Sequence, residues 1–212
     1  MHYNILIETL WKDDYTNYMV NNGYFLNESG WLVAYQSKQG GFWMRVTVMG
    51  AGNSGLAMAA HLSKEGNHVT LWNRSGSTIS KLVETHVIHC EGIFSGAVRI
   101  DRITDDIEPA LDDPDIVLIT TPANSHKELA ELIANHIRKS TVIILNPGRT
   151  LGALEFKRTY DKYNSKFEQI IAETQTIIYT CRKTSEDSVN IMAMKDSVLI
   201  SALDARMNQK II

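Results

Sequence analysis

Residues 45–66 read RVTVMGAGNSGLAMAAHLSKEG and join three local signals in one run. Residues 45–49 form an apolar segment of the length of a buried strand. Three glycines follow within six residues and predict a tight turn. From Asn53 onward, apolar side chains recur on one face of a helix that Gly66 would stop. The run therefore predicts a strand, a glycine-rich turn and a helix in direct succession.

The glycines of the turn follow the pattern G-x-G-x-x-G, and each position has its own physical reason. Gly50 permits the tight turn, Gly52 lets the backbone approach a diphosphate, and Gly55 lets the helix pack closely on the strand. The free N–H groups and the dipole at the start of the helix favour an anion. Asn53 and Ser54 either add side-chain contacts to that anion or are exposed polar residues. We expect a dinucleotide to bind here.

Outward from this turn, apolar runs alternate with amphipathic segments along the chain. Strands are predicted at 45–49, 68–72, 115–120, 141–145, 167–172, 176–181 and 189–200 (the last with a turn at 195–196), and helices at 53–66, 77–85, 107–111, 125–138 and 152–163. The segment 87–101 contains Gly92 and Gly96 and predicts a hairpin or a kinked strand. The alternation predicts an α/β fold, a Rossmann-type doubly wound and mostly parallel sheet with helices on both faces.

The residues after the second strand bear on the choice between NAD and NADP. An NAD site usually has an acidic residue there, which binds the ribose hydroxyls. This chain has Asn73, Arg74 and Ser75 instead. A carboxylate would repel a 2′-phosphate, whereas a guanidinium can pair with it through two hydrogen bonds. We therefore expect NADP as the cofactor, with NAD as the alternative, although Arg74 could also be a solvated surface residue.

Two further loops follow predicted strands at the edge of the sheet where ligands bind. Residues 121–126 read TPANSH, and residues 146–150 read NPGRT. Both loops are polar and contain a proline, and we expect both near the nicotinamide and its ribose. Thr121, Pro122 and Ala123 begin the first of these loops. Asn146 could bind the nicotinamide amide or could serve as a turn residue.

Other polar residues of these loops allow more than one role. His126 could transfer a proton, or it could be a structural residue in the first turn of the next helix. Arg149 could hold a substrate carboxylate or form a surface ion pair. Glu173 and Gln175 end another predicted strand and could face the same cleft. We assign no catalytic residue and no metal site in this chain.

Composition excludes several other classes of protein. The formal net charge is −3 with acidic and basic residues mixed, so we expect no nucleic-acid partner. No apolar run reaches the length of a membrane span, and charges interrupt the N-terminal segment early, so we expect a cytoplasmic protein without a membrane partner. Cys90 and Cys181 show neither disulfide nor metal spacing, which fits a reducing compartment. The oligomeric state stays open.

The composition changes near Met44. Residues 1–43 hold three of the four tryptophans, Trp11, Trp31 and Trp43, and turn-rich segments such as NNGYFLNESGW. We interpret residues 1–43 as an N-terminal appendage that packs on the domain, or as the product of a misassigned start. Residues 44–203 form the predicted dinucleotide-binding domain.

Four segments together resemble one known family. GAGNSGLAMAAHL, TPANSH, LNPGRTLGALEF and AETQTIIYTCR are similar to the N-terminal domain of the octopine and nopaline (opine) dehydrogenases, and the third and fourth segments are the most specific. The resemblance runs from about Met44 to the C-terminus. It implies an NAD(P)H-binding Rossmann domain followed by a helical domain that supplies the catalytic histidine and its acidic partner. The reaction that it implies is the reductive condensation of an amino acid with a 2-oxo acid.

Carried over to this sequence, the resemblance gives the loops their roles. Gly50, Gly52 and Gly55 would bind the diphosphate, and Asn73 and Arg74 would lie at the adenosine ribose. The segment 121–123 would line the nicotinamide, and the segment 146–148 would shape the cleft.

Residues 204–212 would begin the helical domain, so the family's catalytic histidine has no counterpart here. We therefore expect the chain to be a truncated dehydrogenase that turns over poorly or not at all.

Two other functions compete with this interpretation. A ketopantoate reductase or a glycerol-3-phosphate dehydrogenase would share the architecture, although LNPGRTLGALEF and AETQTIIYTCR fit these enzymes less well. A non-catalytic nucleotide-binding module would bind the cofactor without turnover.

Overall fold

The computed structural model describes residues 24–26, 32–34 and 43–211 and divides the chain into two compact units, Met1–Met44 and Arg45–Ile212. In the first unit, strand β1 (Tyr24–Leu26) pairs antiparallel with β2 (Leu32–Ala34). The rest of the predicted appendage, residues 1–43, lies outside the described residues apart from Trp43. The second unit carries the predicted site.

The second unit is built on a seven-stranded sheet. Its strands, in spatial order, are β7 (Arg102–Thr104), β4 (His68–Trp72), β3 (Arg45–Met49), β8 (Ile116–Ile119), β9 (Val142–Leu145), β10 (Ile170–Thr174) and β13 (Ile200–Ala202). The first six strands are parallel, and β13 alone runs antiparallel to its neighbour β10. The order reverses direction between β3 and β8, which is the switch point at which doubly wound sheets bind ligands. The predicted mostly parallel, doubly wound sheet is confirmed.

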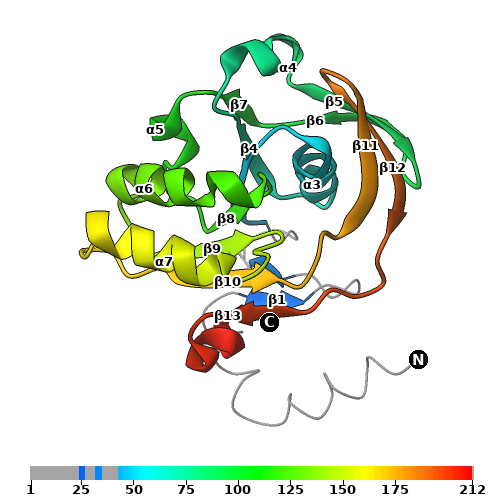
Figure 1. Ribbon diagram of the computed structural model, residues 1–212. Coiled ribbons are helices and arrows are strands. Elements are labelled where there is room, and N and C mark those ends of the chain that lie inside the picture. The colour runs from blue at the N-terminus through cyan, green and yellow to red at the C-terminus, as the bar shows by residue number, and fades with distance from the viewer. Residues whose placement is uncertain (1–23, 27–31, 35–42, 212) are drawn as a thin grey trace. The chain divides into compact units, whose positions relative to one another are not determined.

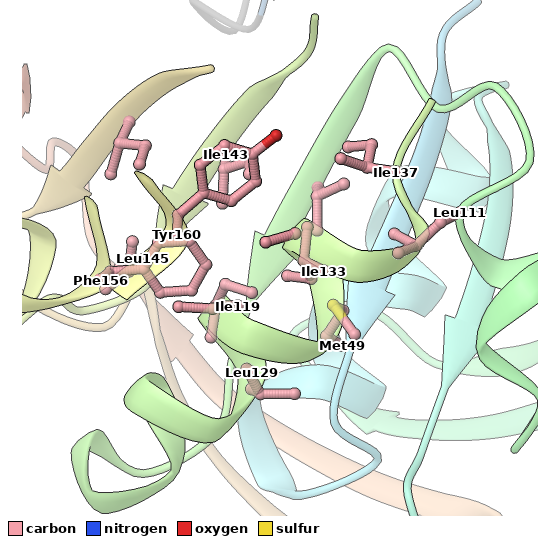
Figure 2. Close-up of a cluster of buried hydrophobic side chains, with 14 of the residues drawn as sticks. Met49, Leu111, Ile119, Leu129, Ile133, Ile137, Ile143, Leu145, Phe156 and Tyr160 are labelled. Atoms are coloured by element: carbon pink, nitrogen blue, oxygen red, sulfur yellow. The ribbon is translucent and has the colours of Figure 1, made fainter. Parts of the chain in front are cut away.

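Helices cover both faces of this sheet (Figure 1). Helix α3 (Asn53–Lys64) covers one face, and α5 (Ile107–Ala110), α6 (His126–His136) and α7 (Gly152–Tyr163) cover the other. On the latter face, buried side chains of α6 and α7 interdigitate with those of the strands (Figure 2). Ile133 and Phe156, for example, are fully buried between helix and sheet. This apolar layer fixes the strand ends from which the loops of the site project.

A second, four-stranded sheet lies beyond α3. Its order is β11 (Tyr179–Ser185), β12 (Ser188–Met194), β5 (Val87–Gly92) and β6 (Gly96–Arg99). The segment 87–101 is thus a hairpin, with Gly92 and Gly96 at positive φ on either side of its turn. Helix α3 lies between the two sheets, as Figure 1 shows. Its residues 56–60 are at most 1% exposed, which is typical of a helix that is buried all round.

Several predicted boundaries differ from the observed ones. The strand predicted at 167–172 begins only at Ile170, because the Gln169 side chain binds the backbone N–H of Thr141 and the Tyr160 hydroxyl. The strand predicted at 176–181 is β11, at 179–185, and the segment 189–200 divides into β12 and β13 in different sheets.

The predicted helices at 77–85 and 125–138 each begin with a 3₁₀ turn. The first comprises η1 (Gly76–Thr78) and α4 (Ser80–Thr85), in which Val83 is 43% exposed. The second comprises η2 (Ala123–Ser125) followed by α6. After β13, the Asp204 side chain caps the 3₁₀ helix η3 (Ala205–Lys210). Among the described residues, no helix is long and apolar enough to span a membrane.

Candidate functional site

The glycine turn joins the end of β3 to α3, and close packing requires two of its glycines. Gly50 has a φ of +112°, and a Cβ atom there would lie 2.7 Å from the Thr121 methyl group. Its N–H donates to the carbonyl of Trp72 at the end of β4. A Cβ on Gly55 would lie 1.7 Å from the Gly50 carbonyl oxygen, so only glycine lets the helix approach the strand this closely. These contacts fix the shape of the turn.

Gly52 differs from the other two, because a Cβ there would meet no atom of the described residues within 4 Å. Its backbone, with φ −83° and ψ −167°, is open to any residue. Internal packing therefore does not explain the glycine, whereas the approach of a ligand would. No side chain in the described part of the chain caps α3, whose first turn also lacks an acidic residue. The free N–H groups of Asn53 and Ser54 fit a diphosphate.

The end of β4 is tied to the same turn. The Asn73 side-chain oxygen accepts a hydrogen bond from the N–H of Ala51 at 3.0 Å, and its amide nitrogen donates to the carbonyl of Ser75. Asn73 therefore orients the glycine turn. Its expected contact with the ribose would be made in addition to these two hydrogen bonds.

Arg74 lies at the surface, next to Asn73. Its guanidinium pairs with the Glu128 carboxylate on α6 at 2.5 Å, and both side chains are more than 60% exposed. The hydrogen bond that Arg74 donates to Glu128 raises the pKa of Arg74 further above its usual value. The pair joins the loop after β4 to α6 beside the switch point of the sheet, where an adenosine ribose is expected.

The loop after β8 contacts the glycine turn directly. The Thr120 hydroxyl donates to the carbonyl oxygens of Met49 and Gly50, and the Ser125 hydroxyl donates to the Thr121 hydroxyl oxygen at 2.8 Å. Pro122 and Ala123 are exposed at the tip of this loop, where they are available to a ligand.

In the loop after β9, Asn146 is 2% exposed. Its backbone N–H donates to the Ile119 carbonyl, and its side-chain oxygen accepts from the Thr174 hydroxyl at 3.1 Å. These bonds tie the ends of β8, β9 and β10 together. The buried side chain acts structurally in this arrangement, whereas Arg149, which has a φ of +60°, is exposed.

His126 is the first residue of α6 and is 1% exposed. Its Nε2–H donates to the Thr121 carbonyl at 3.3 Å, and its Nδ1 has no partner among the described residues. Burial lowers the pKa of the imidazole, against the opposing effects of the Thr121 carbonyl and of Glu155 and Glu173. A neutral, enclosed imidazole that holds the β8 loop favours the structural interpretation of His126 over proton transfer.

Glu173 faces α7, where its carboxylate accepts from the N–H of Ala153 at 3.1 Å. A Cβ on Gly148 would lie 2.0 Å from the same carboxylate, so the β9 loop packs tightly over it. Gln175, at the following loop, is exposed. Of these two candidates, Glu173 therefore stabilises the β9 loop.

The structure brings the predicted residues together at the carboxyl ends of four neighbouring strands, β4, β3, β8 and β9. It also adds two residues that sequence reasoning missed, Glu128 and Lys183. The Lys183 ammonium donates to the Ala51 carbonyl at 3.2 Å, and its backbone N–H donates to the Asn53 side chain at 2.8 Å. Lys183 follows the turn by about 130 residues, and no sequence pattern links the two.

The remaining features lie away from this edge. A cavity of about 430 Å³ lies at the amino ends of the strands, between α5 and the end of α6, and is lined by Leu111, Asp113 and His136 among others. Within the described residues there is no group of acidic, histidine and cysteine side chains that could hold a metal ion. Cys90 and Cys181 are free thiols.

Similar proteins share this architecture. An opine dehydrogenase of Arthrobacter sp. (strain 1C) is 36% identical over 159 residues, which are 74% of this chain and 44% of that protein. An octopine dehydrogenase structure in complex with NADH and agmatine matches with a TM-score of 0.67 at 18% identity, covering 76% of this chain and 42% of the other. A yersinopine dehydrogenase structure with NADP⁺ bound matches with a TM-score of 0.59 at 15% identity, covering 79% and 44%.

The resemblance to opine dehydrogenases is thereby confirmed, and the chain spans less than half the length of these three proteins. A family model also matches residues 45–174, from the first residue of β3 to the last residue of β10. Because this match includes the glycine turn and the six parallel strands, the chain belongs to the family described as the N-terminus of NAD-dependent glycerol-3-phosphate dehydrogenase.

Proposed function

We propose that this chain is the NADP(H)-binding domain of an opine-type dehydrogenase. One observation carries the proposal: the opening of α3 is uncapped and Gly52 leaves free space in front of it, at the switch point of the sheet. Backbone N–H groups and a helix dipole directed at one open space favour a diphosphate. The 36% identity to an opine dehydrogenase supports the choice of enzyme class.

The residues that follow β4 support the preference for NADP. No carboxylate directly follows this strand, and the exposed Arg74 guanidinium lies where a 2′-phosphate would be expected. Glu128 currently occupies that guanidinium, so a phosphate would have to share Arg74 or displace Glu128. A phosphate pairs with arginine through two charge-assisted hydrogen bonds. The exposed ion pair of Arg74 with Glu128 contributes little free energy, so its loss would cost little. The yersinopine dehydrogenase relative, whose structure holds NADP⁺, offers a precedent in this fold.

The reaction proposed for the whole protein is the reductive condensation of an amino acid with a 2-oxo acid. Bound NADPH would supply the hydride. The residues of this chain would bind and orient the cofactor: the turn at 50–55 its diphosphate, Asn73 and Arg74 its adenosine ribose, and the segment 121–123 its nicotinamide side. The buried Asn146 would shape that side by holding the loop after β9 in place. We propose no proton donor among the described residues. The one candidate, His126, is enclosed and held by the Thr121 carbonyl.

The proposed domain bounds are 44–203 for the dinucleotide-binding domain and 204–212 for the beginning of a following helical region. Catalysis needs the hydride donor and both substrates held in one cleft. The chain alone is therefore expected to bind the cofactor with little or no turnover.

The test is parallel calorimetric titration of the chain with NADPH and NADH. We expect NADPH to bind about tenfold more tightly, a difference of about 1.4 kcal/mol. Arg74→Ala should erase most of this preference, whereas Arg158→Ala, which removes an exposed arginine of α7, should preserve it. Equal affinities in the unsubstituted chain would contradict the choice of NADP, and failure of both cofactors to bind would contradict the proposal as a whole.

A second candidate is an oxidoreductase of the glycerol-3-phosphate dehydrogenase type, which the description of the matching family model favours. A ketopantoate reductase would share the same cofactor domain. A substrate panel on a full-length protein that contains this domain would separate these enzymes: oxidation of NADPH only with an amino acid and a 2-oxo acid together supports the opine type. Cofactor binding without turnover on any of the substrates would indicate a non-catalytic module.

A further inference from the structure

A lysine of the second sheet contacts the glycine turn of the first. Lys183 lies on β11, and its ammonium donates a hydrogen bond to the Ala51 carbonyl at 3.2 Å. Its backbone N–H donates to the Asn53 side chain, at the first residue of α3. Two hydrogen bonds therefore tie this residue to both ends of the short segment that faces the expected diphosphate.

The strand that carries Lys183 is itself firmly held. At the turn between β11 and β12, Glu186 accepts hydrogen bonds from the Ser80 hydroxyl and the Lys81 backbone, and the buried Asp187 pairs with the Lys81 ammonium at 2.8 Å. These contacts fix the hairpin against α4. The position of Lys183 beside the turn is thus set by the packing of β11 and not by a flexible surface loop.

In the part of the chain that the structure describes, the charge of Lys183 has no acidic partner. Among the described residues, no carboxylate lies within ion-pair distance of its ammonium, because the nearby Glu186 and Asp187 are engaged with α4. Burial lowers the pKa of Lys183, and Glu186 and Asp187 oppose this effect only from a distance. Partial burial of an ammonium group costs solvation free energy, and a hydrogen bond to a carbonyl oxygen compensates it only in part. An anion at the turn would compensate the rest.

We propose that the Lys183 ammonium binds a phosphate group of the dinucleotide, as a charged supplement to the backbone amides of the turn. The inference rests on the proposed cofactor binding and names a residue of that site on the second sheet. Ala51 is contacted by Lys183 at its carbonyl and by Asn73 at its N–H, so the ammonium and the residue expected at the ribose bind the same residue of the turn. Both phosphates share the same chemistry, and the experiment distinguishes them.

The experiment measures the dissociation constants of NADPH and NADH for four forms of the chain. Lys183→Met removes the charge and keeps the apolar stem, and Lys183→Arg restores a cation. Arg182→Met removes a charge from the neighbouring, exposed position of β11, whose side chain alternates to the other face of the strand. Thermal unfolding without cofactor checks that each variant folds.

A charge-assisted hydrogen bond to a phosphate corresponds to a loss of about ten- to a hundredfold in affinity when it is removed. Lys183→Met should show this loss, while Lys183→Arg and Arg182→Met stay within about threefold of the unsubstituted chain. An equal loss for both cofactors assigns the contact to the diphosphate, and a loss for NADPH alone assigns it to the 2′-phosphate.

A second readout uses the unsubstituted chain and does not depend on the variants folding. Reductive methylation followed by mass spectrometry should show that NADPH protects Lys183 and leaves the exposed Lys162 of α7 unprotected. Normal cofactor binding by Lys183→Met, or no protection of Lys183, would overturn this inference alone. Failure of the unsubstituted chain to bind either cofactor would overturn both the inference and the proposed function.

Discussion

Three glycines of one turn serve different physical purposes. Gly50 adopts a positive φ, Gly55 has no space for a Cβ, and Gly52 has both an ordinary backbone conformation and open space around it. The first two requirements belong to the folded chain itself. The third is explained by a ligand, so the three positions should respond differently to the same substitution.

Gly55→Ala should destabilise the protein by at least about 2 kcal/mol, because its methyl group would overlap the Gly50 carbonyl oxygen. Gly52→Ala should change the free energy of unfolding by less than about 0.5 kcal/mol. It should nevertheless weaken NADPH binding at least about tenfold, because the methyl group would occupy the diphosphate position. Urea unfolding and calorimetry on both variants measure these effects. A stable Gly52→Ala variant with unchanged affinity would contradict the assignment.

The structural interpretation of His126 leads to a dependence of stability on pH. Burial lowers the pKa of His126 in the folded chain, whereas in the unfolded chain the pKa is about 6.5. The unfolded chain therefore takes up the proton first, and stability should fall as the pH falls below about 6.5. His61, whose pKa burial also lowers, adds to this loss.

His126→Gln should make the free energy of unfolding less dependent on pH between about 7 and 5.5, since it removes one of these two groups. Urea unfolding at a series of pH values measures the slopes. An unchanged slope in His126→Gln would mean that the imidazole is not held neutral in the folded protein.

The sequence brought out the candidate cofactor-binding residues because each of them follows a strand directly. The glycine pattern, Asn73 with Arg74, and the loop after β8 are all local signals that the strand–helix alternation places at one edge. The partners of these residues could not be predicted in the same way. The pairing of Arg74 with Glu128 depends on the tertiary distance between the β4 loop and α6.

Helices and strands differ in how well the sequence predicts them. The helix α3 and the strands β3, β4 and β9 are predicted to within two residues at each end, because their apolar patterns are regular and glycine or polar residues delimit them. The observed strands after residue 165 begin or end several residues from their predicted bounds, since side chains such as Gln169 compete for the backbone groups of the ladder. The second sheet could not be predicted, because its pairing of β5 with β12 joins segments about 100 residues apart.

The turn between β11 and β12 fixes the second sheet through one buried carboxylate. Asp187 is 1% exposed and accepts a hydrogen bond from the Ser185 hydroxyl at 2.8 Å, in addition to its pair with Lys81. Burial opposes ionisation, but the hydrogen bonds from Lys81 and Ser185 outweigh it and lower the pKa of Asp187 to about 2. Its contribution to stability is therefore present above the unfolded value of about 4 and is lost as the pH falls toward 2.

Asp187→Asn should lower stability at neutral pH and reduce the loss of stability between about pH 4 and 2. The exposed Asp112→Asn should leave both unchanged. The measurement is the midpoint of thermal unfolding at pH values across this range. If Asp187→Asn lost stability with acid as steeply as the unsubstituted chain, the hairpin would be held by other contacts.

The parallel sheet and its helices hold the loops of the site in position. The apolar layer of α6 and α7 against β8 and β9 carries the loops that are expected to surround the nicotinamide (Figure 2). Ile133 of α6 is fully buried in this layer, whereas Leu154 of α7 is 49% exposed. The two residues provide a matched test of how much the layer contributes.

Ile133→Ala should reduce the free energy of unfolding by about 2–5 kcal/mol, through lost burial and the cavity that it leaves. Leu154→Ala should change it by no more than about 0.5 kcal/mol. Urea unfolding followed by circular dichroism measures both. Comparable effects of the two substitutions would show that this layer is not the core of the unit.

We propose that the diphosphate of a dinucleotide binds the backbone amides at the start of α3. The most direct test is an NMR titration of the ¹⁵N-labelled chain with NADPH, which follows every backbone amide at once. The amide resonances of Gly52, Asn53 and Ser54 should show some of the largest shifts. Unchanged resonances there, with shifts gathered instead around the cavity between α5 and α6, would contradict it.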